Sequence, residues 1–196
     1  MTLAELIAEV YTITGRPDRV AETLSAVKSA TLKLHQSDYY YKDMFESGVA
    51  FDSASFVQNL DYRALLPRWR AIKYLRKYDA ASGTPGKELE LIVPENVFDA
   101  YTVQKQDIYY VAGAYIQINS STEDQYYILG CYLNPDITQT GYNSWIALDH
   151  PYAIIFDAAG SVFKAIGKDD EAAMYKNLGI EQLVNLKASN IVANGF

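Results

Sequence analysis

The chain has 196 residues, of which 49% are apolar, and its 17 basic and 24 acidic side chains give a net charge of −7. This length fits one medium domain, or one domain with an inserted subdomain, and the apolar fraction suffices for a buried core. The acidic balance argues against a broad nucleic-acid-binding surface, because affinity for the phosphate backbone comes mostly from lysine and arginine.

The first 37 residues predict a pair of helices. Thr2 and Glu5 have the spacing of a capping box, and apolar residues then recur every three or four positions. Gly15 ends this helix, and a second helix is predicted from about Asp18 to His35. The short link between the two favours a helical hairpin.

Residues 38–148 predict an antiparallel β unit. The stretch 68–79 shows both helical spacing and strand alternation, and we favour a strand; the Gly- and Pro-containing stretch 81–88 predicts a loop. Alternation is clearest in residues 107–119, where every second residue from Ile108 to Ile118 is apolar or aromatic. The segment 125–135 is predicted to return as the partner strand.

Residues 149–190 predict a second pair of helices. Pro151 suits a first helical position, Gly167 ends the first of these helices, and Asp169 caps the next. A short apolar tail, 191–196, follows. The order of helix pair, β unit and helix pair predicts an α+β fold, an α-helical bundle with an inserted antiparallel β-sandwich.

The sequence offers few groups for catalysis or metal binding. It contains only two histidines, His35 and His150, and one cysteine, Cys131, and it has no phosphate-binding glycine loop. His35 could form an acid–base pair with Asp38, but the end of a helix explains this histidine equally well, and we favour that interpretation. Asp149 is interpreted as a helix cap. We therefore expect no catalytic residue, no cofactor and no metal.

Location is predicted from what the chain lacks. One cysteine permits no intrachain disulfide, and the N-terminus has no basic region of the kind that opens a signal peptide. No apolar run approaches the roughly 18 residues of a membrane span. We expect a protein made in the cytoplasm, with no membrane partner.

The most unusual stretch is DYYYKDMFESG, residues 38–48, in a chain with 17 tyrosines. A stacking platform for single-stranded nucleic acid would need a positive groove, and the neighbours of these tyrosines are acidic. Core packing explains one or two of the three, because a strand sends successive side chains to opposite faces. Exposed tyrosines suit subunit interfaces. The interface candidates here are Tyr39, Tyr40 and Tyr41.

Basic residues cluster just beyond this stretch, with six of the 17 between positions 63 and 77. They could form a solvated strand face, contact phosphate, or meet the acidic surface of a neighbouring copy. The negative net charge favours the last alternative, because charge complementarity sets the register between copies. The interface candidates in this cluster are Arg68, Arg70, Lys73 and Arg76.

The order of segments resembles the head-to-tail adaptor, or connector, proteins of short-tailed bacteriophages whose adaptor carries a β-sandwich. The resemblance runs nearly from end to end. It rests on TLAELIAEVYTITGRPD, VKSATLKLHQSDYYYKD, PRWRAIKYLRKYD, DIYYVAGAYIQIN with YYILGCYLNPDIT, and SWIALDHPYAIIFDAAGSVFKAIGKDDEAAMY.

The resemblance implies a structural virion protein of the phage neck that is not an enzyme. Such adaptors form a homo-oligomeric ring, typically a dodecamer, which binds the portal and presents a platform to tail tube, nozzle or fibre proteins. During ejection, DNA passes through the ring without specific binding. By position, Ile191, Val192 and Phe196 would anchor the C-terminal tail to the portal. Alternatives are another tail-completion or minor tail structural protein and, less favoured, a tail-associated cell-wall hydrolase.

Overall fold

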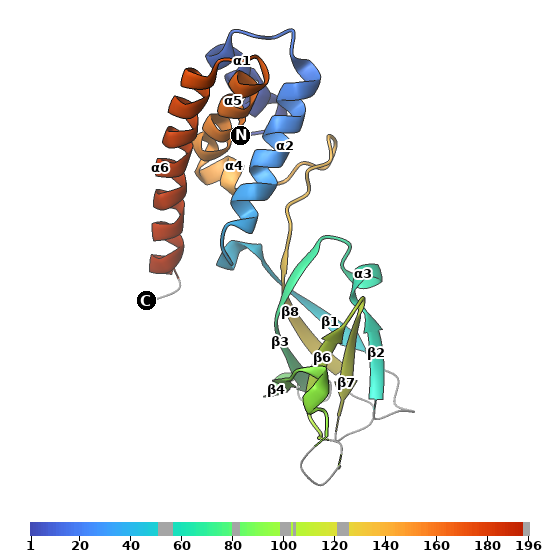
Figure 1. Ribbon diagram of the computed structural model, residues 1–196. Helices are drawn as coiled ribbons and strands as arrows, with labels where there is room; N and C mark the ends of the chain where they lie inside the picture. The colour runs from blue at the N-terminus through green and yellow to red at the C-terminus, as the bar shows by residue number, and fades with distance from the viewer. Residues whose placement is uncertain (51–56, 80–82, 99–102, 104, 121–125, 194–196) are drawn as a thin grey trace. The chain divides into compact units, whose positions relative to one another are not determined.

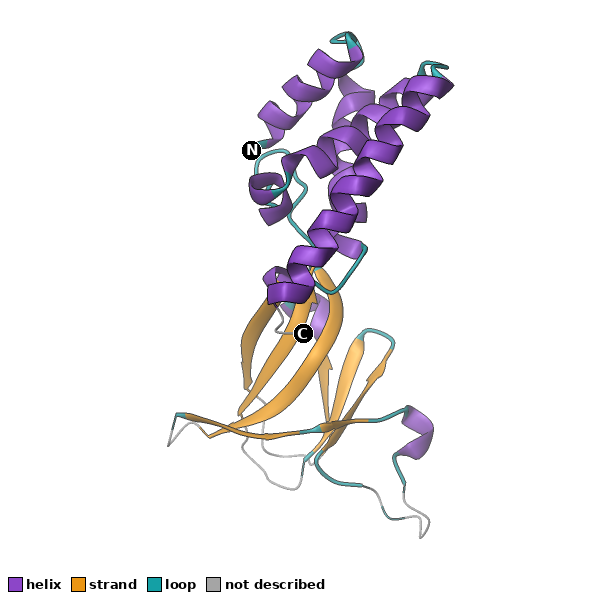
Figure 2. Cartoon of the chain, turned by 90° about the vertical axis from the view of Figure 1, so that its left-hand side faces the viewer, coloured by secondary structure: helices purple, strands orange, loops and turns teal. Residues whose placement is uncertain are grey.

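A computed structural model describes residues 1–196 apart from 51–56, 80–82, 99–102, 104, 121–125 and 194–196, and it places the backbone but not the side chains of 49–50, 57–58 and 191–193. The described residues form a mixed α+β fold with six α-helices and two four-stranded sheets (Figures 1 and 2). The chain divides into two compact units. A helical unit combines Met1–Asp43 with Asn134–Phe196, and a β unit comprises the continuous segment Met44–Leu133.

The helical unit begins with the predicted capping box. The backbone N–H of Glu5 donates to Thr2 Oγ1 at 3.3 Å, and that of Thr2 donates to Glu5 Oε2 at 2.7 Å. Gly15 ends the first helix with a φ of 63°, in the left-handed region. The elements of the unit are α1 (Leu3–Thr14), α2 (Val20–Gln36), the 3₁₀ turn Tyr41–Asp43, α4 (Trp145–Asp149), α5 (Pro151–Ala165) and α6 (Asp169–Ala193).

One hydrophobic core joins helices from both ends of the sequence. Helix α5 packs against α1, α2, α4 and α6, and residues from both ends of the sequence are fully buried in this core, such as Leu6 and Ile154. Gly160 lets α5 and α6 approach closely, because a Cβ there would lie 2.8 Å from Lys176 Cγ. A Cβ at Gly179 would make an ordinary contact, 3.4 Å from the Asp157 nitrogen. No described helix combines the length and apolar character needed to cross a bilayer.

The β unit contains two sheets whose strand orders are β1-β8-β3-β4 and β2-β7-β6-β5, with every pairing antiparallel except the parallel pair β5–β6. A short helix connects β2 to β3. The elements are β1 (Met44–Ala50), β2 (Val57–Asp61), α3 (Tyr62–Leu65), β3 (Trp69–Asp79), β4 (Thr84–Glu88), β5 (Glu90–Leu91), the 3₁₀ turn Pro94–Asn96, β6 (Ile108–Ala112), β7 (Tyr115–Asn119) and β8 (Tyr126–Leu133).

Side chains from both sheets form a single second core. Leu75, Leu129 and Cys131 from one sheet are fully buried in the same cluster as Ile116 and Ile118 from the other. Burial raises the pKa of the Cys131 thiol to about 11. The separate cores explain why the two units are compact on their own.

The predicted strand at 68–79 is confirmed as β3, but other β predictions differ. Residues 107–119 form a hairpin because Gly113 turns the chain with a φ of 63°, so the alternation restarts and Tyr109 is buried instead of Tyr110. Strand β8 pairs with β1 and β3, so the prediction that it returns alongside 107–119 is wrong. The predicted loop 81–88 contains β4, which pairs with the end of β3.

The unit boundaries also differ from the predicted ranges 1–37, 38–148 and 149–190. The link after α2, including the Tyr41–Asp43 turn, belongs to the helical unit, as does the segment from Asn134. Ser144 begins α4, a helix that the sequence did not suggest, by accepting the Ala147 N–H at 3.3 Å. Helix α6 extends to Ala193.

A close aromatic contact in the β unit yields a stability prediction. A Cβ at Gly130 would lie 2.5 to 2.7 Å from three ring carbons of Tyr74 on the adjacent strand, so Gly130→Ala must displace the ring. We expect a loss of about 1 to 3 kcal/mol in unfolding free energy. Gly48→Ala on β1 is the matched control, because nothing lies within 4 Å of its added Cβ.

Alkylation of Cys131 during urea unfolding measures this loss, because the buried thiol reacts only when the β unit opens. The Gly130→Ala midpoint should fall while the Gly48→Ala midpoint stays level or rises slightly. Equal midpoints in the two variants would show that the contact with Tyr74 does not constrain the sheet.

Candidate functional site

The three consecutive tyrosines lie in the link between α2 and β1, and they divide into one buried and two exposed side chains. Tyr40 is 0% exposed: its ring centroid lies 5.3 Å from that of Trp145, and its hydroxyl is 2.8 Å from Ser37 Oγ. Tyr39 and Tyr41 are 55% and 44% exposed. The tyrosines precede β1, so the division does not arise from strand alternation, and Tyr40 belongs to the helical core.

The link around these tyrosines is bonded to the C-terminal helices. Lys42 Nζ donates to Asp149 Oδ2 at 2.6 Å, and this hydrogen bond raises the pKa of Lys42. The backbone N–H of Tyr41 donates to Asn190 Oδ1 at 3.3 Å. The sequence predicts Asp149 as a helix cap, but Asp149 is the last residue of α4, and the N-cap of α5 is His150, which makes no side-chain capping bond.

A buried network surrounds His35 at the end of α2. His35 Nδ1 lies 2.7 Å from Asp43 Oδ1, and His35 Nε2 lies 2.9 Å from Ser144 Oγ. The same Asp43 oxygen accepts a hydrogen bond from the indole N–H of Trp145 at 2.7 Å. His35, Asp43 and Ser144 are 1%, 7% and 4% exposed. The network joins the end of α2, the 3₁₀ turn and the start of α4.

The partner of His35 in this network is Asp43, whereas the sequence had suggested Asp38. Asp38 Oδ1 instead accepts its neighbour's N–H, that of Tyr39, at 2.7 Å. Asp43 lies eight positions and Ser144 lies 109 positions from His35 in the sequence. Spacing within one helix therefore could not reveal either partner, and only the fold brings them together.

The order of carboxylate, imidazole and hydroxyl matches the connectivity of a serine-hydrolase triad. Ser144 Oγ, however, also accepts the Ala147 N–H as the N-cap of α4 and is hydrogen-bonded to Tyr142. Ser144 borders a pocket of about 550 Å³ at the start of α1. With 4% of Ser144 exposed and its oxygen shared among three groups, the geometry suits a structural tie better than an accessible nucleophile.

The basic candidates differ in their exposure and in their contacts. Lys73 lies over the ring of Tyr132 at 6.0 Å, and Arg76 lies over the ring of Tyr74 at 4.3 Å. Arg70 is half-buried on β3. The remaining candidate, Arg68, is exposed just before β3. Cation–π contacts of this kind contribute up to about 1 kcal/mol at exposed sites, so two of the four cations also serve the β unit itself.

The proposed C-terminal anchors lie outside what the structure describes. The backbone of Ile191 and Val192 continues α6, but the positions of their side chains are not described, and Phe196 is beyond the described residues. Among the residues that are described, no group of three or more histidine, cysteine, aspartate or glutamate side chains is placed to hold a metal ion. No protein-family model and no curated protein sequence matches the chain.

The network around His35 yields a second stability prediction. Asp43→Ala removes the acceptor of the buried His35 and the partly buried Trp145 N–H, and we expect a loss of about 2 to 4 kcal/mol in the unfolding free energy of the helical unit. Trp145 fluorescence in a Trp69→Phe background reports that unit alone, because Trp69 is the other tryptophan of the chain and lies in the β unit.

Asp38→Ala is the matched control. This aspartate accepts an exposed hydrogen bond, so its removal should cost less than about 1 kcal/mol. If Asp38→Ala destabilised the helical unit as much as Asp43→Ala, the assignment of Asp43 as the supporting carboxylate would be wrong.

Proposed function

We propose that this chain is a structural protein of a phage neck, a ring-forming head-to-tail adaptor that joins the portal to the tail and extends the DNA channel. The observation that carries the proposal is that both ends of the chain fold into one helical unit, while the continuous segment Met44–Leu133 forms a separate β unit between them. This is the modular order on which the resemblance to phage adaptors rests.

The finer architecture is part of the proposal. Five helices share one core, which supports a helical bundle as the ring-forming body. The two sheets share another core, which supports a β-sandwich inserted between the second and the fourth of the helices. A bundle packs side by side in a ring, and an inserted module is free to contact other proteins.

Exposed apolar side chains support subunit contacts. On the helical unit, several large apolar residues are about half or more exposed, a property of surfaces that partners cover when they form a contiguous patch. Their positions on the link, on α4 and α5 and on α6 would serve more than one neighbour. These residues are Tyr39, Leu148, Tyr152, Met174, Ile180 and Val184.

The net charge of −7 supports a passive role towards DNA. Binding to DNA is driven largely by the release of counterions when lysine and arginine neutralise phosphates. An acidic ring would forgo that gain, and DNA would slide through it. The proposed partners are therefore other copies of the chain, the portal, and tail tube, nozzle or fibre proteins.

Two alternatives carry less weight. Another tail-completion or minor tail structural protein could have the same arrangement of a helical unit and an inserted β unit. Only its position in the particle would distinguish it from an adaptor. A tail-associated cell-wall hydrolase gains some support from the connectivity of Ser144, His35 and Asp43. Purified protein that turned over peptidoglycan, and lost this activity in Ser144→Ala, would favour the hydrolase.

Assembly with the portal tests the proposal directly. The protein is mixed with the portal protein of the same phage, and the complex is examined by mass photometry and negative-stain microscopy. We expect a ring, with twelve copies in the typical case, seated on the portal. Absence of both a ring and a portal complex would rule the adaptor out, whereas a monomer in the absence of portal would not.

Tyrosine substitutions separate assembly from folding. Tyr39→Ala and Tyr41→Ala change exposed rings, so we expect weaker assembly on the portal with unfolding free energies within about 0.5 kcal/mol of the parent. Tyr40→Ala empties a buried site beside Trp145 and should cost about 3 to 5 kcal/mol. Unchanged assembly in both exposed variants would remove these tyrosines from the interface.

A further inference from the structure

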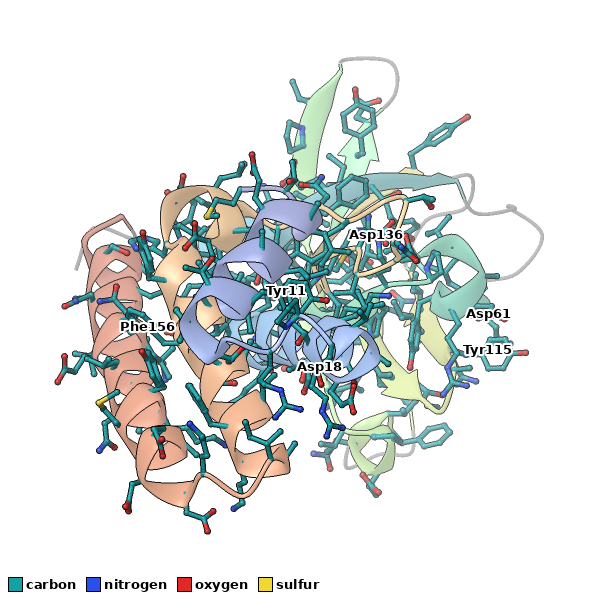
Figure 3. All side chains as sticks on the ribbon, turned by 90° about the horizontal axis from the view of Figure 1, so that it is seen from above. Tyr11, Asp18, Asp61, Tyr115, Asp136 and Phe156 are labelled. Carbon is teal, nitrogen blue, oxygen red and sulfur yellow. The ribbon has the colours of Figure 1, made fainter. Side chains whose placement is uncertain are left out.

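Two packed helices leave a groove on each side of their line of contact. Among the described elements of the helical unit, α1 fills one of the two grooves between α2 and α5. Helix α1 contacts both α2 and α5, and it buries its apolar face in their shared core. Figures 1 and 3 show α6, α5 and α2 as neighbours, with α1 to one side of α2 and α5.

The opposite groove of the pair is open and has a volume of about 520 Å³. Most of its lining side chains are alanine or serine, which lets a further helix approach the backbones of α2 and α5 closely. The only branched aliphatic residue in the lining, Val162, is 1% exposed. The lining residues are Ala21, Glu22, Ser25, Ala26, Ser29, Ser161, Val162 and Ala165.

The outer face of α1 has a matching surface. Ala4, Ala8 and Thr12 recur every four residues and are exposed, so they form one smooth stripe along this helix. The stripe lies opposite the buried face that holds α1 on its own α2 and α5. That buried face consists of Leu3, Leu6, Val10 and Thr14.

We propose that the open groove between α2 and α5 receives α1 of a neighbouring copy of this chain. The inference rests on the proposed ring and assigns the surfaces that build it. Within one copy, the outer face of α1 and the open groove point away from each other across the α2–α5 pair. Contacts of this kind are heterologous, so each copy offers a stripe to one neighbour and a groove to the other, and repetition closes a ring.

Charge favours another copy as the occupant. Helix α1 carries Glu5 and Glu9 and no basic residue, and Glu5 is bonded to its own helix N-terminus. Lys28 and Lys164 are sequence neighbours of the lining residues Ser29 and Ala165, and neither has a carboxylate partner among the residues that the structure describes. Glu9 of one copy therefore meets an excess of positive charge beside the groove of the next.

The acidic residues nearby do not cancel this excess of positive charge beside the groove. Glu22 in the groove is paired with Arg19 at 2.9 Å, and Asp157 on α5 is paired with Lys33 on α2. The attraction between α1 and the groove is exposed to solvent, so assembly should weaken as salt is raised towards 1 M, where the Debye length falls to about 3 Å.

Cysteine cross-linking tests the contact in the full chain. A double variant, Ala8→Cys with Ser25→Cys, places one thiol on the stripe and one in the groove. The two sites lie on opposite sides of the α2–α5 pair, so they cannot join within one chain, because a disulfide requires Cα atoms within about 7 Å. Mild oxidation in the presence of the portal protein should give a ladder of covalent multimers at least about tenfold above the control.

The matched control is Ala8→Cys with Met174→Cys, which moves the second thiol to an exposed position on α6. Native Cys131 is buried with its pKa raised to about 11, so it contributes little to cross-linking. A ladder no stronger than the control, dimers from either single variant, or cross-linking of Ser25→Cys to the portal alone would each overturn the proposed contact.

The outcomes separate this inference from the proposed function. Rings on the portal without a ladder would be consistent with the adaptor function and would rule out the contact between α1 and the groove. A ladder with neither closed rings nor a portal complex would support the contact and rule the adaptor out. The absence of a ladder, of rings and of a portal complex would rule out both proposals. Ser25→Trp adds a second measurement: it fills an exposed groove position, so ring formation should fall at least about tenfold while thermal unfolding stays unchanged.

Discussion

The fold depends on closing the helical unit around a chain that leaves it at Asp43 and returns at Asn134. Holding together the two ends of so long an inserted segment costs conformational entropy, which local bonds must offset. These bonds lie where the chain leaves and re-enters the helical unit. Gln36 Nε2 donates to Asn134 Oδ1 at 3.2 Å, and Asp43 joins His35 and Trp145. This buried carboxylate links the chain before the β unit to the chain after it, so the inserted segment can vary without loosening the helices.

That constraint explains why the most reactive-looking residues are better suited to architecture than to chemistry. A histidine between a carboxylate and a hydroxyl is a catalytic device only where the hydroxyl meets a substrate. Ser144 Oγ accepts the hydrogen bond that caps the N-terminus of α4. Trp145 packs its ring against Tyr40 and donates its indole N–H to Asp43. Ser144 and Trp145 therefore each make two structural contacts. Tyr40, which lies between the two exposed tyrosines, belongs to the same cluster.

Features that depend on neighbouring residues could be predicted from the sequence. The capping box of Thr2 and Glu5, the left-handed Gly15 and the strand at 69–79 were all predictable from neighbouring residues. Prediction from the sequence was wrong or incomplete where contacts between distant residues determine the structure. The alternation around Gly113 does not reveal that this residue turns the chain with a φ of 63°. The pairing of β8 with β1 and β3 joins segments that lie far apart in the sequence. The partners of His35 became visible only in the fold, as did the groove between α2 and α5, because small side chains leave no periodic apolar signal.

The proposed use of α1 also bears on when assembly occurs. Its outer stripe of alanine and threonine buries little apolar area, and at about 25 cal/mol per Å² one such contact is weak. In the proposed ring, a face with so little apolar area would by itself hold two free copies together only weakly. A ring supplies two such contacts to each copy, and a template that gathers copies raises their effective concentration. Weak, matched helix faces therefore suit a subunit that should assemble on a portal and remain dispersed before reaching it.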